Sequence, residues 1–255
     1  MTTPRILTPY ERTQLARYLG PQVPTDIPAD IPIEYITGKV EFCDLVFSIT
    51  PDALIPRIET EELVHRAERE LHRLVAESPQ DKKLVVADVG TGCGAVLITL
   101  AHLFRAQGSQ IMWLGSDISD TATAVASTNA TALLGSDHAL QLFVSDLLQD
   151  YPAELMFDLL IANLPYIPHD RIAFLDASVN EHEPHLALDG GVDGLTLIHA
   201  FLREATARTR SGGVILLEMD YTHTADDFNI YRPDWIIRVE TDSFTRNRFA
   251  RLERK

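Results

Sequence analysis

The sequence predicts an α/β fold of the Rossmann-like type, in which a mostly parallel, seven-stranded sheet carries helices on both faces. The first observation behind this prediction is the alternation of short apolar runs with helical segments from residue 84 to residue 218. The second is the glycine-dense segment 90–94, which lies between an apolar run and a helical one, as in a tight strand-to-helix turn. Parallel strands need helical crossovers, so we expect the chain to wind as successive βαβ units.

Seven apolar runs have the length and composition of strands, and we expect the last two to pair antiparallel. The runs are residues 84–87, 111–117, 140–144, 157–162, 213–218, 235–240 and 248–252. Helical periodicity predicts helices at 59–77, 95–104, 119–133 and 195–207. Ser119 is a suitable N-cap for the third of these helices. We expect residues 164–194 to form a long irregular loop.

The segment before the sheet divides into an extension and a hairpin. Residues 8–19 have helical periodicity, and the prolines at 22, 24, 28 and 32 predict a stiff, extended linker after them. Residues 35–58 alternate apolar and polar positions with period two, which predicts a β-hairpin. We therefore divide the chain into a short N-terminal helix with its proline-rich linker, 1–34, and one large domain that begins with the hairpin, 35–255.

Composition excludes several classes of protein. Lysine and arginine total 22 against 37 aspartates and glutamates, and the resulting net charge of −15 argues against nucleic acid as the direct substrate. Cys43 and Cys93 are far apart and no paired His/Cys cluster is present, so we expect neither a disulfide framework nor a metal site. The polar N-terminus and the lack of a long apolar run predict no signal peptide and no membrane helix, hence a cytoplasmic protein.

The glycine turn predicts a site for a nucleotide-like ligand. Glycines suit the backbone angles of a tight loop and let a ligand approach the main chain, while the following helix offers unpaired N–H groups. Gly90, Gly92 and Ala95 satisfy the loose dinucleotide fingerprint. Asp88, Gly90, Gly92 and Gly94 satisfy the first motif of methyltransferases that use S-adenosylmethionine (SAM). The turn alone leaves both cofactor classes open.

Polar residues stand at the ends of four predicted strands, namely Asp88, Asp117, Asp146 and Asn163. In open parallel sheets ligands bind beyond the carboxyl ends of the strands, so we expect these side chains to meet in one crevice. The Asp117 carboxylate can accept hydrogen bonds from both hydroxyls of a ribose, which fits NAD and SAM equally. We expect Asp146 near an adenine amino group, and Asp88 between the glycine loop and the amino-acid portion of the ligand.

The fourth strand end distinguishes the two cofactors. Asn163, Leu164, Pro165 and Tyr166 follow the strand where the reacting group of the cofactor should lie. A planar NH₂ is a poor nucleophile because its lone pair is delocalised. The side-chain carbonyl of Asn163 and the backbone carbonyl of Leu164 can each accept one of its N–H groups and aim the nitrogen at a methyl donor. Pro165 stiffens the turn and Tyr166 offers an aromatic wall.

Five segments together resemble the glutamine methyltransferases of peptide chain release factors, which are SAM-dependent protein-(glutamine) methyltransferases. The segments are 35–42 (YITGKVEF), 54–64 (LIPRIETEELV), 88–94 (DVGTGCG), 163–166 (NLPY) and 183–195 (EPHLALDGGVDGL). The resemblance covers roughly residues 32–252. Most SAM methyltransferases share the third segment, and enzymes that methylate adenine amines share the fourth, so the second and fifth segments are the specific ones.

The resemblance implies a SAM methyltransferase fold and the transfer of a methyl group to the side-chain amide nitrogen of a glutamine, with S-adenosylhomocysteine as the other product. The target implied is the glutamine of a Gly-Gly-Gln motif in a release factor, which makes a protein the partner. The residues implied in SAM binding are Asp88, Gly90, Thr91, Gly92, Cys93, Gly94, Asp117, Asp146, Leu147 and Asn163. The catalytic segment would be Asn163, Leu164, Pro165 and Tyr166, which with Phe42 would also bind the target glutamine. Arg57 would line the same pocket.

Two departures from the family pattern bear on substrate recognition. The family usually has Asn-Pro-Pro-Tyr where this chain has Leu164 in the second position, which predicts a less rigid turn. Members also carry a longer helical N-terminal domain that helps to dock the release factor, whereas about 30 residues precede the resemblance here.

Three other functions remain compatible with parts of the pattern. The nearest is an adenine-amine methyltransferase acting on RNA or DNA with the same NLPY geometry, against which the acidic charge weighs. The second is a SAM- or nucleotide-binding regulator without activity. The third is an NAD oxidoreductase, which would bind NAD and no SAM.

Overall fold

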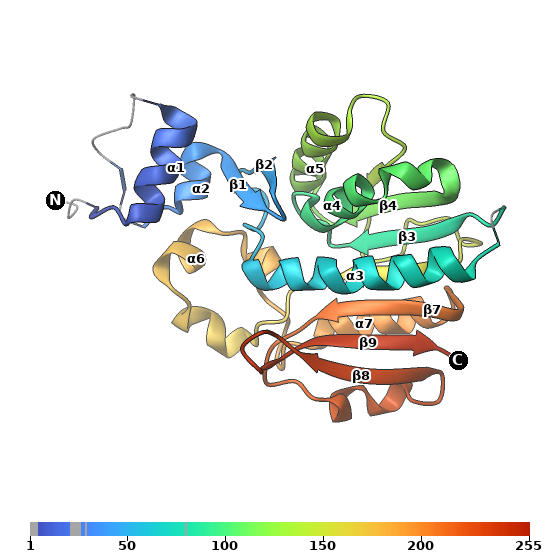
Figure 1. Cartoon of the computed structure of the whole chain (residues 1–255). Coiled ribbons are helices and arrows are strands. Elements are labelled where there is room, and N and C mark those ends of the chain that lie inside the picture. Colours follow the sequence, from blue (N-terminus) through green and yellow to red (C-terminus); the bar gives the residue numbers. More distant parts are fainter. Residues whose placement is uncertain (1–4, 21–26, 29, 80) are drawn as a thin grey trace.

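The computed structural model describes residues 5–20, 27–28, 30–79 and 81–255. Its centre is a seven-stranded sheet in the order β5-β4-β3-β6-β7-β9-β8 (Figure 1). The five strands from β5 to β7 are parallel, and β9 pairs antiparallel with both of its neighbours. Their bounds are β3 (Leu84–Val89), β4 (Ile111–Asp117), β5 (Gln141–Val144), β6 (Phe157–Ala162), β7 (Thr209–Glu218), β8 (Trp235–Thr241) and β9 (Asn247–Arg254). The predicted fold class is confirmed.

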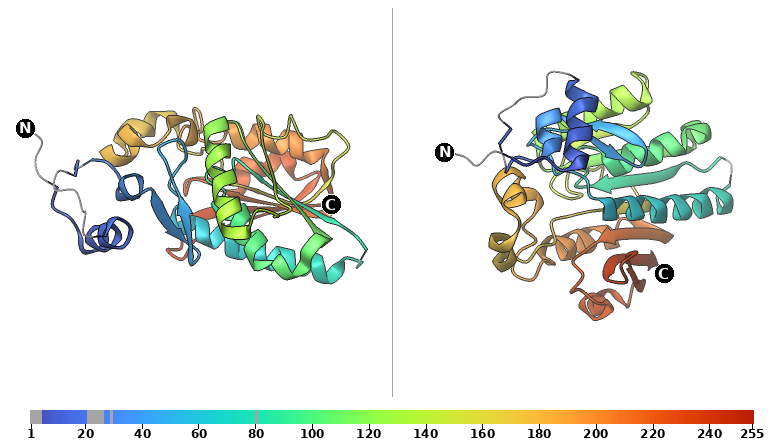
Figure 2. Two further views of the ribbon diagram at one scale, coloured as in Figure 1. Left: turned by 90° about the horizontal axis from the view of Figure 1, so that it is seen from above. Right: turned by 60° about the vertical axis from the view of Figure 1, so that its left-hand side comes forward.

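Helices cover both faces of the sheet. One face carries α3 (Ile58–Glu77), α4 (Ala95–Leu103) and α5 (Asp120–Leu134), and the other carries α7 (Thr196–Thr206) and the 3₁₀ helix η4 (Ala225–Tyr231) (Figures 1 and 2). Successive residues of the central strand β3 point to opposite faces of the sheet. Val86 belongs to the hydrophobic core under α3 and α4, and Ala87 belongs to the core under α7. Because both faces of β3 and β6 are buried, their sequences are apolar except for one buried aspartate in each, Asp88 and Asp158.

A separate two-stranded sheet precedes the main one. Strands β1 (Lys39–Phe42) and β2 (Leu45–Ser48) pair antiparallel, which confirms the predicted hairpin. Cys43 and Asp44 form its two-residue turn, both with positive φ, as a tight hairpin requires. The hairpin packs on the α3–α4–α5 side of the domain through Phe42 and Phe47. It is therefore part of the same core as the sheet.

The N-terminal helix α1 (Pro9–Leu19) begins with a capping box in which Thr8 and Glu11 satisfy each other's backbone N–H groups. It contacts the hairpin through Tyr18, whose hydroxyl donates to the Glu41 carboxylate at 3.0 Å. The predicted extended linker lies partly outside the described residues, because 21–26 and 29 are not among them. Within its described part a short helix, α2 (Ile33–Thr37), was not predicted. It begins after Pro32 and ends at Gly38, which adopts the left-handed conformation.

The long loop predicted at 164–194 contains three short helices. They are η2 (His169–Phe174), α6 (Ala177–His182) and η3 (His185–Ala187), and η1 (Arg105–Gln110) is a further short helix that extends α4. Pro168 and Pro184 occupy the N-cap positions of η2 and η3. Each of these helices is too short to show helical periodicity, and none of them was predicted. None of the helices in the described part of the chain is long and apolar enough to span a bilayer.

The sheet order fixes where a ligand would bind. The chain passes from β3 to β4 on one side and returns to β6 on the other, so the connections after β3 and β6 diverge. A crevice forms at the carboxyl ends of strands where the order reverses in this way. The four polar residues singled out in the sequence all lie at or just after these ends.

Candidate active site

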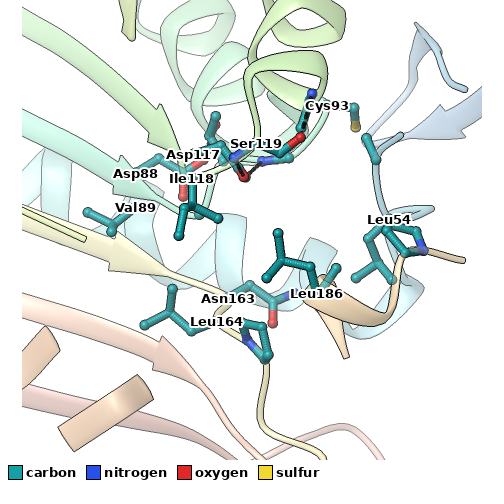
Figure 3. Close-up of a pocket in the computed structure, with 18 of the residues that line it drawn as sticks. Leu54, Asp88, Val89, Cys93, Asp117, Ile118, Ser119, Asn163, Leu164 and Leu186 are labelled. Carbon is teal, nitrogen blue, oxygen red and sulfur yellow. Dashed lines mark hydrogen bonds between the residues drawn. The ribbon is translucent and has the colours of Figure 1, made fainter. Parts of the chain in front are cut away.

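A cavity of about 200 Å³ opens at the carboxyl edge of the sheet, between the glycine loop and the turn that begins with Asn163. Figure 3 shows Asp88 and Asp117 on one side of it and Asn163 and Leu164 on the other. The predicted site residues that line it are Asp88, Gly90, Thr91, Gly92, Cys93, Asp117, Asp146, Leu147, Asn163, Leu164 and Pro165. The structure thus gathers residues from four strand ends around one space.

The glycine loop lies tightly against the neighbouring strand. The backbone N–H groups of Gly90 and Thr91 both donate to the carbonyl of Ser116 on β4, at 2.9 and 2.8 Å. Gly90 has φ of +75°, and a Cβ on it would lie 3.0 Å from Cδ2 of Leu164. The positive φ therefore favours glycine at this position, and the missing Cβ leaves room for the Leu164 side chain.

Asp117 is held in a fixed orientation at the end of β4. Its Oδ2 accepts from the N–H of Gly92 and its Oδ1 from the N–H of Ser119, each at 2.9 Å. Burial raises the pKa of this carboxyl above its ordinary value despite these hydrogen bonds. Each oxygen keeps a further lone pair for a donor in the cavity, as a ribose diol requires.

Asp88 is 2% exposed and lies behind the glycine loop. Its Oδ2 accepts from the Thr91 hydroxyl at 2.7 Å. Burial raises the pKa of Asp88 to about 7, and the negative charge of Asp117 adds to the effect. The carboxyl therefore changes its charge near neutral pH, so a cation in the cavity would favour its ionised form.

The third strand end carries a strained turn. Leu147, which follows Asp146 in the cavity wall, has φ of +52°, a conformation that a leucine adopts only at a cost. The Ser145 hydroxyl donates to the carbonyl of Leu147 at 2.9 Å and holds the turn in place. This contact keeps the Leu147 side chain, which is 8% exposed, at the wall of the cavity.

The turn after β6 rests on the glycines of segment 183–195. A Cβ on Gly190 would lie 2.7 Å from Cα of Tyr166 and 2.8 Å from the carbonyl oxygen of Pro165. These are backbone atoms, which cannot turn aside as a flexible side chain would. The segment therefore fixes the path of the main chain through 164–166.

The substitution Gly190→Ala should displace this turn. We expect a loss of roughly 1–3 kcal/mol in the free energy of unfolding, because overpacking against backbone is not relieved by rotamer changes. Catalytic activity should fall by about tenfold or more, because a small misplacement of the backbone carbonyls in this turn is costly. Urea unfolding and kcat measure the two effects. The control Gly212→Ala, with no atom within 4 Å of the added Cβ, should leave kcat unchanged. Equal kcat values for both variants would contradict this interpretation.

Four predicted site residues do not line the cavity, namely Gly94, Phe42, Tyr166 and Arg57. Gly94 begins α4 behind the loop, where a Cβ would meet Ile98 and Ala126. Phe42, predicted to bind substrate, is instead 1% exposed and packs edge-on against Phe47, with ring centroids 6.2 Å apart. The alternating pattern of the hairpin correctly predicted that Phe42 lies on a buried face. The pattern did not predict which residues Phe42 contacts.

Tyr166 points away from the cavity and toward the end of β7. Its hydroxyl donates to Oε1 of Glu218 at 2.9 Å, and the Arg248 guanidinium lies 5.8 Å from the ring centroid. Burial raises the pKa of Tyr166 well above its ordinary range. The predicted aromatic wall is thus a partly buried side chain behind the turn.

Residues that sequence reasoning missed come mainly from the two specific segments of the resemblance. Leu54, Pro56 and Thr60 line the cavity from one segment, and Pro184, Leu186 and Ala187 from the other. Arg57 does not line the cavity but joins the two segments, since its guanidinium lies 2.6 Å from Oε1 of the buried Glu183. The resemblance was the only sequence signal for these positions, because Thr60 lies in a predicted helix that gave no indication of a site and the others lie in segments without periodicity.

A buried amide connects the hairpin to the glycine loop. Asn129 on α5 is 1% exposed, and its Nδ2 donates to the carbonyls of Ser48 and Cys93, each at 2.9 Å. Its Oδ1 accepts from the N–H of Ser48 at 2.7 Å. One side chain therefore satisfies three backbone groups from two other segments.

Replacing this residue, Asn129→Ala, should lower the free energy of unfolding by about 3 kcal/mol or more, because buried backbone groups lose their partners. Urea denaturation measures the loss. The neighbouring Thr128→Ala, which alters the exposed face of the same helix, should change it by less than about 0.5 kcal/mol. A loss for Asn129→Ala no larger than that control would show that water replaces all three hydrogen bonds.

Known proteins resemble this chain in sequence and in fold. The chain is 36% identical over 216 residues to the release factor glutamine methyltransferase of Bradyrhizobium diazoefficiens, covering 84% of this chain and 67% of that protein. It is 33% identical over 238 residues to the release factor glutamine methyltransferase of Enterococcus faecalis, covering 91% and 80%. The relatives are thus longer than the region they share with this chain.

Two further comparisons match parts of this chain, one to a family model and one to a solved structure. The family model described as N-6 DNA Methylase matches residues 67–183. The crystal structure of magnesium protoporphyrin IX methyltransferase from Synechocystis PCC 6803 with bound SAH has a TM-score of 0.51 at 18% identity, covering 78% of this chain and 84% of that one. That likeness shows the fold of a methyltransferase. With identities above 30% over most of both chains, this chain belongs to the release factor glutamine methyltransferase family.

Proposed function

We propose that this protein transfers the methyl group of SAM to the side-chain amide nitrogen of a glutamine in a peptide chain release factor. The observation that carries the proposal is the placement of Asn163 and Leu164 across a single cavity from Asp117 and the glycine loop. A cofactor bound by the loop would meet a planar amide bound by the turn. Family membership favours SAM over NAD.

The cavity has the features that SAM requires. Asp117 offers carboxylate oxygens for the ribose hydroxyls, and Asp146 and Leu147 line the region expected for the adenine. The backbone of the loop is open at Gly92, where no atom lies within 4 Å of an added Cβ. When bound, SAM supplies the methyl group of its sulfonium. The rest of the cofactor then leaves as the thioether S-adenosylhomocysteine.

The residues of the turn would orient the substrate. The Asn163 Oδ1 and the Leu164 carbonyl accept the two N–H groups of the glutamine amide and direct its nitrogen into the cavity. Apolar side chains such as Leu54 and the buried Leu164 would exclude water around it. No strong base is needed, because the amide nitrogen becomes acidic once it carries the methyl group. The rate enhancement comes from orientation and from desolvation.

The names of the relatives support a release factor as the substrate, and a soluble translation factor agrees with the cytoplasmic location expected from the sequence. A second candidate is methylation of an adenine amine in DNA or RNA. The match to the N-6 DNA Methylase family favours it, since it includes the Asn163 turn. The net charge of −15 opposes it, because a nucleic-acid backbone would be repelled.

Methyl transfer from radiolabelled SAM tests the proposal. A purified bacterial release factor should be labelled on its Gly-Gly-Gln glutamine, and the factor with alanine in place of that glutamine should not. DNA and RNA in parallel reactions test the second candidate. Calorimetry with SAM and with NAD decides the cofactor separately. Label in nucleic acid alone would overturn the proposal, and SAM binding without transfer to any substrate would favour a regulator.

A further inference from the structure

The Asn163 side chain is one end of a buried hydrogen-bonded chain that passes through Thr60 and Glu218 to Tyr166. Thr60 lies in the first turn of α3, and Glu218 ends β7, so the chain joins three separate elements at the turn after β6. Thr60 is 3% exposed and Glu218 is 1% exposed. The proposed function uses Asn163 but gives Thr60 and Glu218 no part.

The direction of each hydrogen bond follows from what each group has to donate. The Thr60 hydroxyl lies 2.9 Å from Oε2 of Glu218, and the Tyr166 hydroxyl lies 2.9 Å from Oε1. A carboxylate only accepts, so both hydroxyls donate to it. Burial raises the pKa of Glu218 above its ordinary value. The two hydroxyl donors and the guanidinium of Arg248, with Nη1 3.5 Å from the Tyr166 hydroxyl, oppose that rise and favour the carboxylate.

Thr60 has a single hydroxyl hydrogen, which it donates to Glu218 in a hydrogen bond. Toward Asn163 the Thr60 oxygen therefore presents only lone pairs, and it accepts from Nδ2 of Asn163 at 3.2 Å. The two ends of an asparagine amide have nearly the same shape, so packing alone does not select between them. With Nδ2 turned to Thr60, Oδ1 is left for the cavity.

We infer that Thr60 is a positioning residue that, under the control of Glu218, determines which end of the Asn163 amide faces the substrate. In the reversed orientation, Oδ1 would face the lone pairs of Thr60, and an N–H would face the N–H groups of the substrate. Both contacts would be repulsive. The inference rests on the proposed function, because an exposed acceptor at this position serves only a substrate that donates N–H groups.

Thr60→Val and Thr60→Ser separate the hydroxyl from the shape of the side chain. Thr60→Val should lower kcat for release factor methylation by about tenfold, the factor that one hydrogen bond contributes, with the KM for SAM unchanged. Thr60→Ser keeps the hydroxyl and should restore kcat to within about threefold of wild type. Glu218→Leu removes the acceptor of the Thr60 hydroxyl, which can then donate to Oδ1 of Asn163, and should lower kcat as Thr60→Val does.

Thr99→Val is the matched control. Thr99 is also 2% exposed on a helix, lies outside the cavity wall, and its hydroxyl has no hydrogen-bond partner among the described residues. The same change of atoms there should leave kcat unchanged. Thermal unfolding of every variant identifies any that fails to fold.

The side-chain amide resonances of Asn163 in ¹⁵N-labelled protein provide a readout that does not depend on turnover. These resonances are assigned as the side-chain NH₂ pair that is present in the spectrum of wild type and absent from that of Asn163→Ala. Thr60→Val should shift them and Thr60→Ser should return them toward their wild-type positions. If wild type methylates no release factor, the proposed function fails while these resonances still test the contact. Wild-type kcat in Thr60→Val, an equal loss in Thr60→Ser, or unshifted resonances would each overturn the inference.

Discussion

The variant Asn163→Ala should lose turnover on the order of 10²- to 10³-fold while its affinity for SAM changes by less than about tenfold. Removing one preorganised group that stabilises a transition state has an effect of this size. Alanine removes the Oδ1 that would accept a substrate N–H, whereas Asp117 and the glycine loop, which line the opposite side of the cavity, are unchanged. Single-turnover methylation of a release factor measures the first quantity, and calorimetry with SAM measures the second.

Asn229→Ala is the control for this prediction, because it deletes the same atoms on the exposed surface of η4. It should leave both quantities at their wild-type values. Turnover of Asn163→Ala within about threefold of wild type would remove Asn163 from the mechanism. A parallel collapse of SAM binding would instead assign Asn163 to the cofactor.

The variant Asp88→Asn should be more stable than wild type at pH 8 by up to about 4 kcal/mol, and this difference should vanish near pH 4. The carboxyl has a pKa of about 7 in the folded protein against an ordinary value of 3.8, and each unit corresponds to about 1.4 kcal/mol. Between these values the unfolded chain is ionised while the folded protein holds the proton. The free energy of unfolding of wild type therefore falls as the pH rises through this window.

Urea unfolding of both proteins from pH 4 to pH 8 measures this difference. Asparagine keeps an oxygen that accepts from Thr91, so the hydrogen bond of the loop survives in the variant. Asp117, whose pKa burial also raises, is present in both proteins, and the comparison isolates Asp88. A difference that is constant with pH would mean that Asp88 does not hold a proton in this range.

SAM affinity of wild type should rise from pH 5 to pH 8, because cationic SAM favours the ionised carboxyl, and Asp88→Asn should show a weaker rise.

The elements of the sheet were predictable because their signals are local. The apolar runs predicted every strand of the main sheet, with errors of a few residues, and Ser119 caps α5 as expected, accepting from the N–H of Ala122. Strand ends carry the site in folds of this kind, so Asp117 and Asn163 could be recognised from their positions alone. The strand β7 begins four residues earlier than predicted, at Thr209, where pairing with β6 extends it past its glycines.

What could not be predicted depends on contacts between distant parts of the chain. Phe42 was placed at the substrate because a period-two pattern gives the buried face of a strand and says nothing of its neighbours. The role of Thr60 beside Asn163 depends on a contact across 103 residues. The helices within 164–194 are too short to have a periodicity of their own. The end of this segment is fixed by a contact distant in sequence, the approach of Gly190 to Tyr166.

The contact between Thr60 and Glu218 has a consequence for the biosynthesis of the enzyme. The two residues are 158 positions apart, and Glu218 enters the sheet only when β7 pairs with β6. A growing polypeptide that has emerged as far as Asn163 therefore already contains the glycine loop. It does not yet contain Glu218, so the orientation of the Asn163 amide is not yet determined. Because contacts of long sequence separation form late, the orientation of the Asn163 amide should be among the last features of the cavity to form.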